Sequence, residues 1–364
     1  MNRGYLFSFL LIFLITWSGY GQLTTGGLPP SFLYETGLKS TIDKSVRIPV
    51  NFNTEDLKLV DKWKTGQGAP LRIATLIPTD LSIENAGEWS ELPGGEKIWQ
   101  LHLQAKDATA IMLYYNAFYI PEGGQLFIYN VEKTHVLGAY THITNPLNGK
   151  FVTEFVAGDE IILEYVAAES GENPRIEIEF IGYGYNHLTI SLRSSGSCMV
   201  NINCDEGDAW QNEKRGICRM IQRIGRNSYY CTGSLVNNTA EDLSPYILTA
   251  YHCMEDDLAI ASDEDLTQWM FYFNYESNAC SGTATATGNH ILIGCTRKVA
   301  IPLQGGSDGL LLLLQSNIPE SFDVYYNGWD RREVLPQFGV NIHHPQGDIK
   351  KYPLLPNRQL IIPG

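Results

Sequence analysis

The stretch Leu248-Thr249-Ala250-Tyr251-His252-Cys253 places a histidine and a cysteine directly after a short strand-like run. A second strand-like run, Tyr229 to Val236, contains Cys231. A bridge between Cys231 and Cys253 would tie the two strands together and fix the backbone beside the imidazole. This setting favours a positioned histidine over a solvated or packed one, so we interpret His252 as a catalytic base.

An aspartate that could orient this imidazole lies in Gly305-Gly306-Ser307-Asp308-Gly309, directly before the apolar run Leu310 to Leu314. A carboxylate at the entrance to a buried strand can accept the imidazole N–H, hold one tautomer and stabilise the charged ring. Gly-Ser-Asp-Gly is also good turn chemistry, which is the alternative interpretation. Because Asp308 follows His252 along the chain, we predict that the two form part of a His-Asp-Ser triad.

The third member of such a triad is missing from the sequence. The only serines after Asp308 are Ser316 and Ser321, and neither lies in a Gly-x-Ser-x-Gly segment. We therefore expect that the given chain holds no nucleophilic serine. It would also lack the backbone N–H groups around that serine that bind an oxyanion.

Length and composition bound the class of protein. The 364 residues give room for two or three domains, and the fractions of apolar (44%) and charged (18%) residues are those of a globular chain. A net charge of −14 argues against nucleic acid or an anionic membrane as the main partner, because both would repel it.

The first 21 residues have the layout of a secretory signal peptide: a basic start, an apolar run from Tyr5 to Trp17 and small residues up to Gly21. The apolar run is too short to span a bilayer. All seven cysteines lie between Cys198 and Cys295, and clustered cysteines in an exported chain indicate disulfides. Their odd number leaves one without an intrachain partner. No C-x-x-C pair supports a zinc site.

Residues 22–193 contain no cysteine and form a module of different character. Residues 22–60 are rich in loop signals. From Leu71 on, short aromatic and β-branched runs recur between turn signals at a spacing of about ten residues, which predicts an all-β sandwich. Trp99, Leu101 and Leu103 alternate with polar residues, as in a strand that is buried on one face.

Together, several motifs of residues 196–350 resemble the bacterial lysyl endopeptidases, a trypsin-like family with the chymotrypsin double-barrel fold. The matching segments are Gly196-Ser197-Cys198, Cys204-Asp205-Glu206-Gly207-Asp208, Cys231-Thr232-Gly233-Ser234-Leu235-Val236-Asn237-Asn238-Thr239, Leu248 to Cys253, Asn274-Tyr275 with Cys280, Ser307-Asp308, Gly328-Trp329-Asp330-Arg331-Arg332 and Ile342-His343-His344-Pro345. Residues from Gln22 to about Arg193 more loosely resemble the β-rich propeptide of such precursors.

The resemblance implies that His252 is the general base and Asp308 its partner. It further implies disulfides Cys231–Cys253 and Cys204–Cys280, with Cys198 paired to a cysteine beyond residue 364. The pairing of Cys218 and Cys295 stays open.

The resemblance also implies an all-β chain made of a signal peptide (1–21), a β-sandwich-like propeptide (22–193) and a chymotrypsin-like double β-barrel (194–364) whose second barrel is incomplete. The Gly-x-Ser-Gly segment and the acidic residue that selects lysine should follow the His343-His344-Pro345 region, and no Gly-x-Ser-Gly segment occurs between there and Gly364. Arg193, in the linker-like stretch Leu192 to Ser197, is either a processing point or an ordinary surface arginine. If it is a processing point, arginine specificity stays open.

The implied function is hydrolysis of peptide bonds after basic residues by an enzyme secreted to the periplasm or the extracellular space. Its partners would be protein or peptide substrates, and we expect a monomer that needs no cofactor or metal and contacts no nucleic acid or, after signal removal, membrane. His343 and His344 are adjacent and would point to opposite faces of a strand, so they cannot jointly hold one ion. The alternative is a non-enzymatic secreted binding protein on a protease-like scaffold.

Overall fold

The computed structural model describes residues 23–34, 45–186, 199–280, 290–332, 334 and 339–353. Strands predominate and are mostly antiparallel, which confirms the prediction of an all-β fold. The expected signal peptide, the linker with Arg193, and Cys198 lie outside the described residues. We call the described residues up to 186 the N-terminal module and those from 199 on the C-terminal module.

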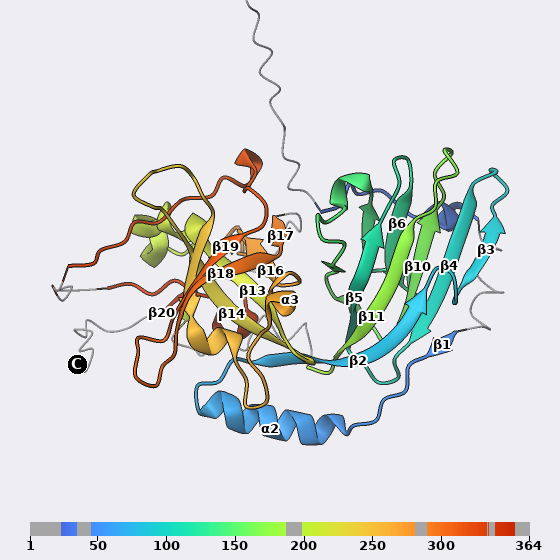
Figure 1. Ribbon diagram of the computed structural model, residues 1–364. Coiled ribbons are helices and arrows are strands. Elements are labelled where there is room, and N and C mark those ends of the chain that lie inside the picture. The colour runs from blue at the N-terminus through green and yellow to red at the C-terminus, as the bar shows by residue number, and fades with distance from the viewer. Residues whose placement is uncertain are drawn as a thin grey trace, which may run out of the picture.

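The N-terminal module consists of two facing layers of strands (Figure 1). The outer sheet has the order β1-β4-β10-β6-β7, with β3 beside β4: β1 (Val46–Arg47), β3 (Glu88–Glu91), β4 (Lys97–Gln104), β6 (Gln125–Asn130), β7 (Val136–Tyr140) and β10 (Glu160–Val166). The inner layer contains β2 (Arg72–Ser82), β5 (Ala110–Tyr119), β8 (Phe151–Val152), β9 (Val156–Ala157) and β11 (Arg175–Gly184).

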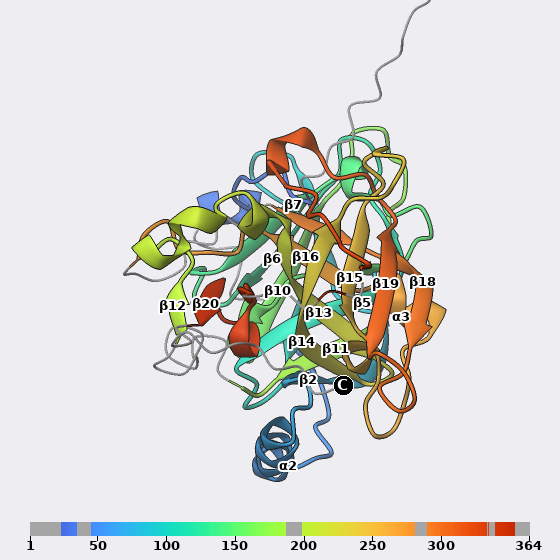
Figure 2. The same cartoon turned by 90° about the vertical axis from the view of Figure 1, so that its left-hand side faces the viewer.

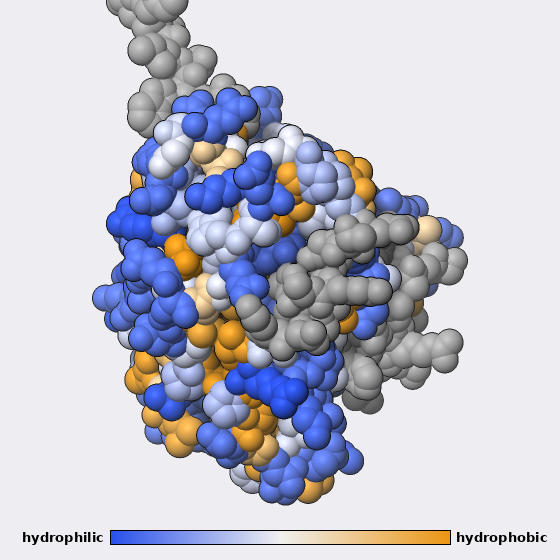
Figure 3. Space-filling view, turned by 90° about the vertical axis from the view of Figure 1, so that its right-hand side faces the viewer, coloured by the Kyte–Doolittle hydropathy of each residue, from blue (hydrophilic) through white to orange (hydrophobic). Residues whose placement is uncertain are grey.

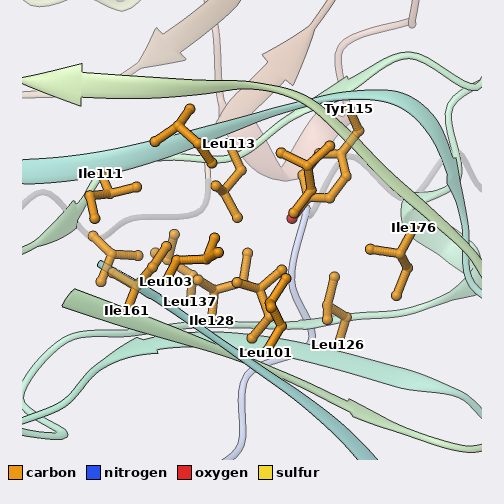
Figure 4. Packing of buried hydrophobic residues seen from close by; sticks show 14 of the residues in the cluster. Leu101, Leu103, Ile111, Leu113, Tyr115, Leu126, Ile128, Leu137, Ile161 and Ile176 are labelled. Carbon is orange, nitrogen blue, oxygen red and sulfur yellow. The ribbon is translucent and has the colours of Figure 1, made fainter. Parts of the chain in front are cut away.

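The core of this module lies between the two layers. Leu101 and Leu103 of β4 meet Ile111 and Leu113 of β5 there (Figure 4), and all four side chains are buried. The opposite face of β4 is not solvated, contrary to a simple alternation. His102 is buried and contacts Glu160 at 3.0 Å, so the polar positions of the strand are covered as well. On the outside of the module, hydrophilic residues are interspersed with apolar ones (Figure 3).

Helix α2 (Thr54–Gly66) begins at the end of the expected loop region, residues 22–60, and extends beyond it. Asn53 caps its first turn by accepting a hydrogen bond from the backbone N–H of Glu55 at 2.9 Å. The helix is mostly exposed, but Asp61 is buried. Its last turn leads directly to β2, and so to the boundary between the modules (Figure 1). No helix among the described residues is long and apolar enough to cross a membrane.

The C-terminal module is an antiparallel sheet with the strand order β17-β16-β13-β14-β15-β19-β18 (Figure 2). The strands are β13 (Ile217–Ile224), β14 (Asn227–Val236), β15 (Tyr246–Ala250), β16 (Met270–Phe273), β17 (Ile291–Ile293), β18 (Cys295–Ile301) and β19 (Gly309–Leu314). Only Gly294 separates the two edge strands along the chain, so the sheet curls until its edges meet. Gly294 accepts a hydrogen bond from the backbone N–H of Gln315 at 3.0 Å, but no strand ladder among the described residues closes a barrel.

The strand-like leucine run is confirmed as β19, with alternate leucines facing the core. Leu310, Leu312 and Leu314 are buried, whereas Leu311 and Leu313 are partly exposed. After β19 the described chain contains short 3-10 turns and the single strand β20 (Lys351–Pro353), which pairs with β12 (Met199–Asn201). The described residues after β19 form no second barrel.

One strand pairing joins the modules into a continuous sheet. Strand β2 pairs antiparallel with the first residues of β14, with Ala74 opposite Ser228. An apolar cluster surrounds this seam and combines Ile73, Ala74, Leu76, Ala110, Met112 and Tyr114 with Ile221, Met270, Tyr272 and Ile291. The modules therefore share buried surface as well as backbone hydrogen bonds.

Buried polar side chains cross the seam. The hydroxyls of Tyr114 and Ser228 lie 2.8 Å apart. The side-chain amide of Gln268 donates to the backbone carbonyls of Tyr115 and Phe151 at 2.9 and 2.8 Å. A buried donor that loses its partner and is not hydrated costs about 1–3 kcal/mol. These hydrogen bonds therefore oppose separation of the two modules.

Glu154, between β8 and β9, provides a test of the seam by pH. Burial raises the pKa of its carboxyl to about 7, although the nearby Arg219 of the C-terminal module opposes the shift. A carboxyl whose pKa is raised in the folded state contributes most to the stability of the fold below its ordinary pKa of 4.5. This contribution to stability is lost as the pH rises towards 7.

Glu154→Gln mimics the protonated carboxyl, so we expect the variant to be more stable than the wild type at pH 8 and nearly equal to it at pH 4.5. Urea unfolding at the two pH values measures the difference. The control Glu177→Gln, at an exposed position of β11, should change the free energy of unfolding little at either pH. Equal effects of Glu154→Gln at both pH values would contradict a raised pKa of Glu154 in the folded state.

Candidate active site

Strand β15 and a short 3-10 turn position His252. The strand ends at Ala250 and the turn Tyr251–Met254 follows it. The hydroxyl of Thr249 donates to the backbone carbonyl of Thr232 in β14 at 2.8 Å. The structure joins Cys231 to Cys253, so the backbone on both sides of His252 is tied to β14.

Asp308 binds His252 through both of its carboxylate oxygens. Oδ2 lies 2.6 Å from the ring Nδ1, and Oδ1 accepts from the backbone N–H of His252 at 2.9 Å. The backbone carbonyl of Asp308 also accepts from the N–H of Tyr251 at 3.0 Å. Asp308 has a φ of 54°, a left-handed conformation that aspartate tolerates better than most residues.

This geometry assembles an acid–base pair. Because Asp308 accepts from Nδ1–H, the tautomer left by this bond presents Nε2 as the nitrogen that can take a proton from a reacting hydroxyl. The His252 side chain is 42% exposed and that of Asp308 20%, so the pair opens to solvent on the imidazole side.

A pocket of about 190 Å³ lies beside His252. Its walls come from both modules: Asp61, Lys64, Ala69 and Pro70 from the N-terminal one, and Tyr229, His252, Glu255, Asp256 and Asp257 from the C-terminal one. The turn after His252 is held by Asp256, whose carboxylate accepts from the hydroxyl of Tyr229 at 2.7 Å and from the side-chain amide of Asn227 at 3.2 Å.

Asp256 stays ionised in this setting. Burial acts to raise the pKa of its carboxyl, but the hydrogen bonds from Tyr229, Asn227 and two backbone N–H groups outweigh burial and lower it. Sequence reasoning missed Asp256 and Tyr229 as part of the site. They are 27 positions apart along the chain and no local motif joins them.

A second disulfide lies in the C-terminal module. Cys204 and Cys280 are bonded across a sequence separation of 76. Nearby, Glu276 accepts from Lys214 at 2.7 Å and from the buried Lys350 at 3.0 Å. Burial alone would raise the pKa of Glu276, and the two ammonium groups lower it instead. A charged cluster thus fixes the segment that precedes Cys280.

The remaining described cysteines are thiols. Cys218 and Cys295 are free and buried, and burial raises the pKa of the Cys218 thiol to about 12. A thiol of this kind is an inert packing group. Cys231, His252 and Cys253 have their ligand atoms within 4.8 Å of one another. The disulfide uses both sulfurs, so this group does not offer thiolates to a metal.

His343 and His344 have structural environments. The ring Nδ1 of His344 lies 2.9 Å from the backbone carbonyl of Asp348, and its backbone N–H donates to the hydroxyl of Thr232. His344 is buried, and burial together with the nearby Lys350 holds its pKa well below the ordinary value. His343 pairs with Lys351 through the backbone. The motif therefore anchors the chain after β19 against β14.

The fold and the site define the class: an all-β protein in which an aspartate orients a strand-end histidine, as in trypsin-like serine proteases. Residues 192–360 match the family model described as the C-terminal domain of lysyl endopeptidase. The chain is also 24% identical over 305 residues to the lysyl endopeptidase of Pseudomonas aeruginosa, an alignment that spans 78% of this chain and 64% of that protein. Residues 192–360 are therefore similar to the C-terminal domain of lysyl endopeptidases, which confirms the resemblance.

The bridge beside His252 makes a stability prediction. Cys231 and Cys253 are 22 positions apart, and the chain-entropy argument for a loop of this length predicts that replacing both by serine lowers the free energy of unfolding by about 3 kcal/mol. Urea unfolding measures the loss. The matched control Cys218→Ala/Cys295→Ala removes two buried thiols and no bridge. An unchanged free energy of unfolding on replacing Cys231 and Cys253 would show that the bridge does not stabilise the fold.

Proposed function

We propose that this chain belongs to the precursor of a secreted serine endopeptidase that hydrolyses peptide bonds after lysine. The observation that carries the proposal is the 2.6 Å contact between Nδ1 of His252 and Oδ2 of Asp308, reinforced by the bond from the backbone N–H of His252. The relation to the lysyl endopeptidases supports both the reaction and the substrate class.

In this proposal His252 is the general base and Asp308 the orienting acid. A serine hydroxyl attacks the scissile carbonyl while Nε2 of His252 takes its proton. Asp308 stabilises the imidazolium that forms, and the ring then gives the proton to the leaving amine. A Gly-x-Ser-Gly segment must supply the nucleophile, and the sequence printed here contains none after Asp308.

The organisation of the chain fits a precursor. In the proposal residues 1–21 direct export, 22–193 form the propeptide and 194–364 belong to the protease domain. Two disulfides suit an oxidising compartment outside the cytosol. Lysine specificity rests on the family relation, with arginine as the alternative because Arg193 lies at the expected processing point. We propose that the enzyme acts as a monomer on protein or peptide substrates.

The direct experiment is to sequence the gene past codon 364 and assay the complete product on lysyl and arginyl peptide amides. We expect a Gly-x-Ser-Gly segment, a further cysteine and turnover that favours lysine. Asp308→Asn should lower kcat by roughly a thousandfold or more, and His252→Ala should do the same, because each removes a group that acts on the reacting proton. Ser316→Ala is the matched control and should keep full activity.

The 364-residue chain itself should show no turnover above buffer on the same substrates, because it carries a base and an orienting acid without a nucleophile. The measurement is release of the amine from lysyl and arginyl substrates by the purified chain. Cleavage that disappears in His252→Ala would contradict this account of the serine.

A further inference from the structure

Two strands, β15 and β2, pair with different parts of one edge of β14. Its last residues pair with β15, with Ser234 opposite Leu248, whereas its first residues pair with β2 of the N-terminal module, with Asn227 opposite Thr75. The other edge is covered by β13. The backbone N–H of Tyr230 donates to the carbonyl of Leu71 at 3.0 Å, so the occupied edge reaches the residue directly before Cys231.

This edge begins beside His252. Cys231 is bonded to Cys253, the neighbour of His252, and Tyr229 lines the same pocket as the imidazole. An extended peptide that lies against His252 and continues along β14 would use the backbone groups that now bind Leu71 and Arg72. Adding an extended strand to a free sheet edge is a recurrent mode of peptide recognition.

The segment that leads into β2 forms the facing wall of the pocket. Ala69 and Pro70 line it together with Lys64 from the last turn of α2. Lys64 forms an ion pair of 2.7 Å with Asp257, five positions after His252. The N-terminal module thus covers the surface beside the imidazole while leaving the ring itself partly exposed.

A series of polar contacts between partly or fully buried side chains holds the start of β2 in place. The hydroxyl of Tyr185 donates to Asp61 at 2.6 Å, and Asp61 pairs with Arg72 at 2.8 Å. Arg72 reaches Asn227 at 3.5 Å, and Asn227 donates to Asp256 in the turn after His252. The chain of contacts runs from inside the N-terminal module to the candidate active site.

We propose that residues 69–75, which line the pocket and pair with β14, are an autoinhibitory strand that occupies the β14 edge on which an extended peptide substrate would lie. Inhibition works by exclusion and leaves the His252–Asp308 pair assembled, because the contacts that hold the pair come from the C-terminal module. This inference rests on the proposed function and specifies how that site is regulated.

The test weakens the seam without touching the catalytic pair. The variant Lys64→Ala/Tyr114→Phe/Lys150→Ala removes contacts to Asp257, Ser228 and Glu264 of the C-terminal module. The matched control Lys58→Ala/Lys97→Ala/Tyr119→Phe removes contacts to Glu55, Trp89 and Glu172 within the N-terminal module.

The first readout is hydrogen–deuterium exchange of the 364-residue chain. We expect the amide of Tyr230, which donates to Leu71, to exchange about tenfold faster in the seam variant than in the wild type or the control. Unchanged exchange of this amide would overturn the assignment of residues 69–75 as a releasable strand.

The second readout is turnover of a lysyl peptide amide by the complete, uncut precursor. Exclusion predicts that the seam variant lowers KM about tenfold with kcat unchanged. Faster exchange without lower KM would overturn the inference and leave the proposed function standing, and a change confined to kcat would show distortion of the catalytic pair instead. If the processed enzyme shows no turnover that depends on His252, the proposed function itself is wrong.

Discussion

Strand β14 is the constraint on which the rest of the structure depends. It pairs with β13 along one edge and with β15 and β2 along the other, and its Cys231 is bonded to the turn that carries His252. The hydroxyl of Thr232 accepts a hydrogen bond from the backbone N–H of His344, so the chain after β19 is attached to the same strand. Sheet, site and both modules are therefore positioned by ten residues.

The seam between the modules is buried like the interior of a domain. Gln268 is almost fully buried and donates to two backbone carbonyls of the N-terminal module, and Tyr114 meets Ser228 inside an apolar cluster. Such groups stabilise a seam when paired and oppose its opening when unpaired. The same arrangement protects the edge of β14 from pairing with other chains, since an uncovered edge strand is a template for association.

The sequence predicted the all-β fold, the strand that ends before His252 and the leucine strand after Asp308, because short alternating runs and turn residues are local signals. The sequence did not predict the pairing of β2 with β14 that joins the modules. Arg72 and Asn227 are 155 positions apart, and neither carries a motif. Helix α2 was missed because most of its residues are exposed and few apolar side chains mark a buried face.

Assembly of the acid–base pair and access to it are separable in this structure. Asp308 holds the ring and the backbone of His252, and the Cys231–Cys253 bridge holds the turn, all within the C-terminal module. The pocket wall and the β14 edge are instead completed by residues 61–72 of the N-terminal module. A chain built this way can keep the His252–Asp308 pair in one geometry while the β14 edge is occupied, because covering that edge requires no distortion of the histidine.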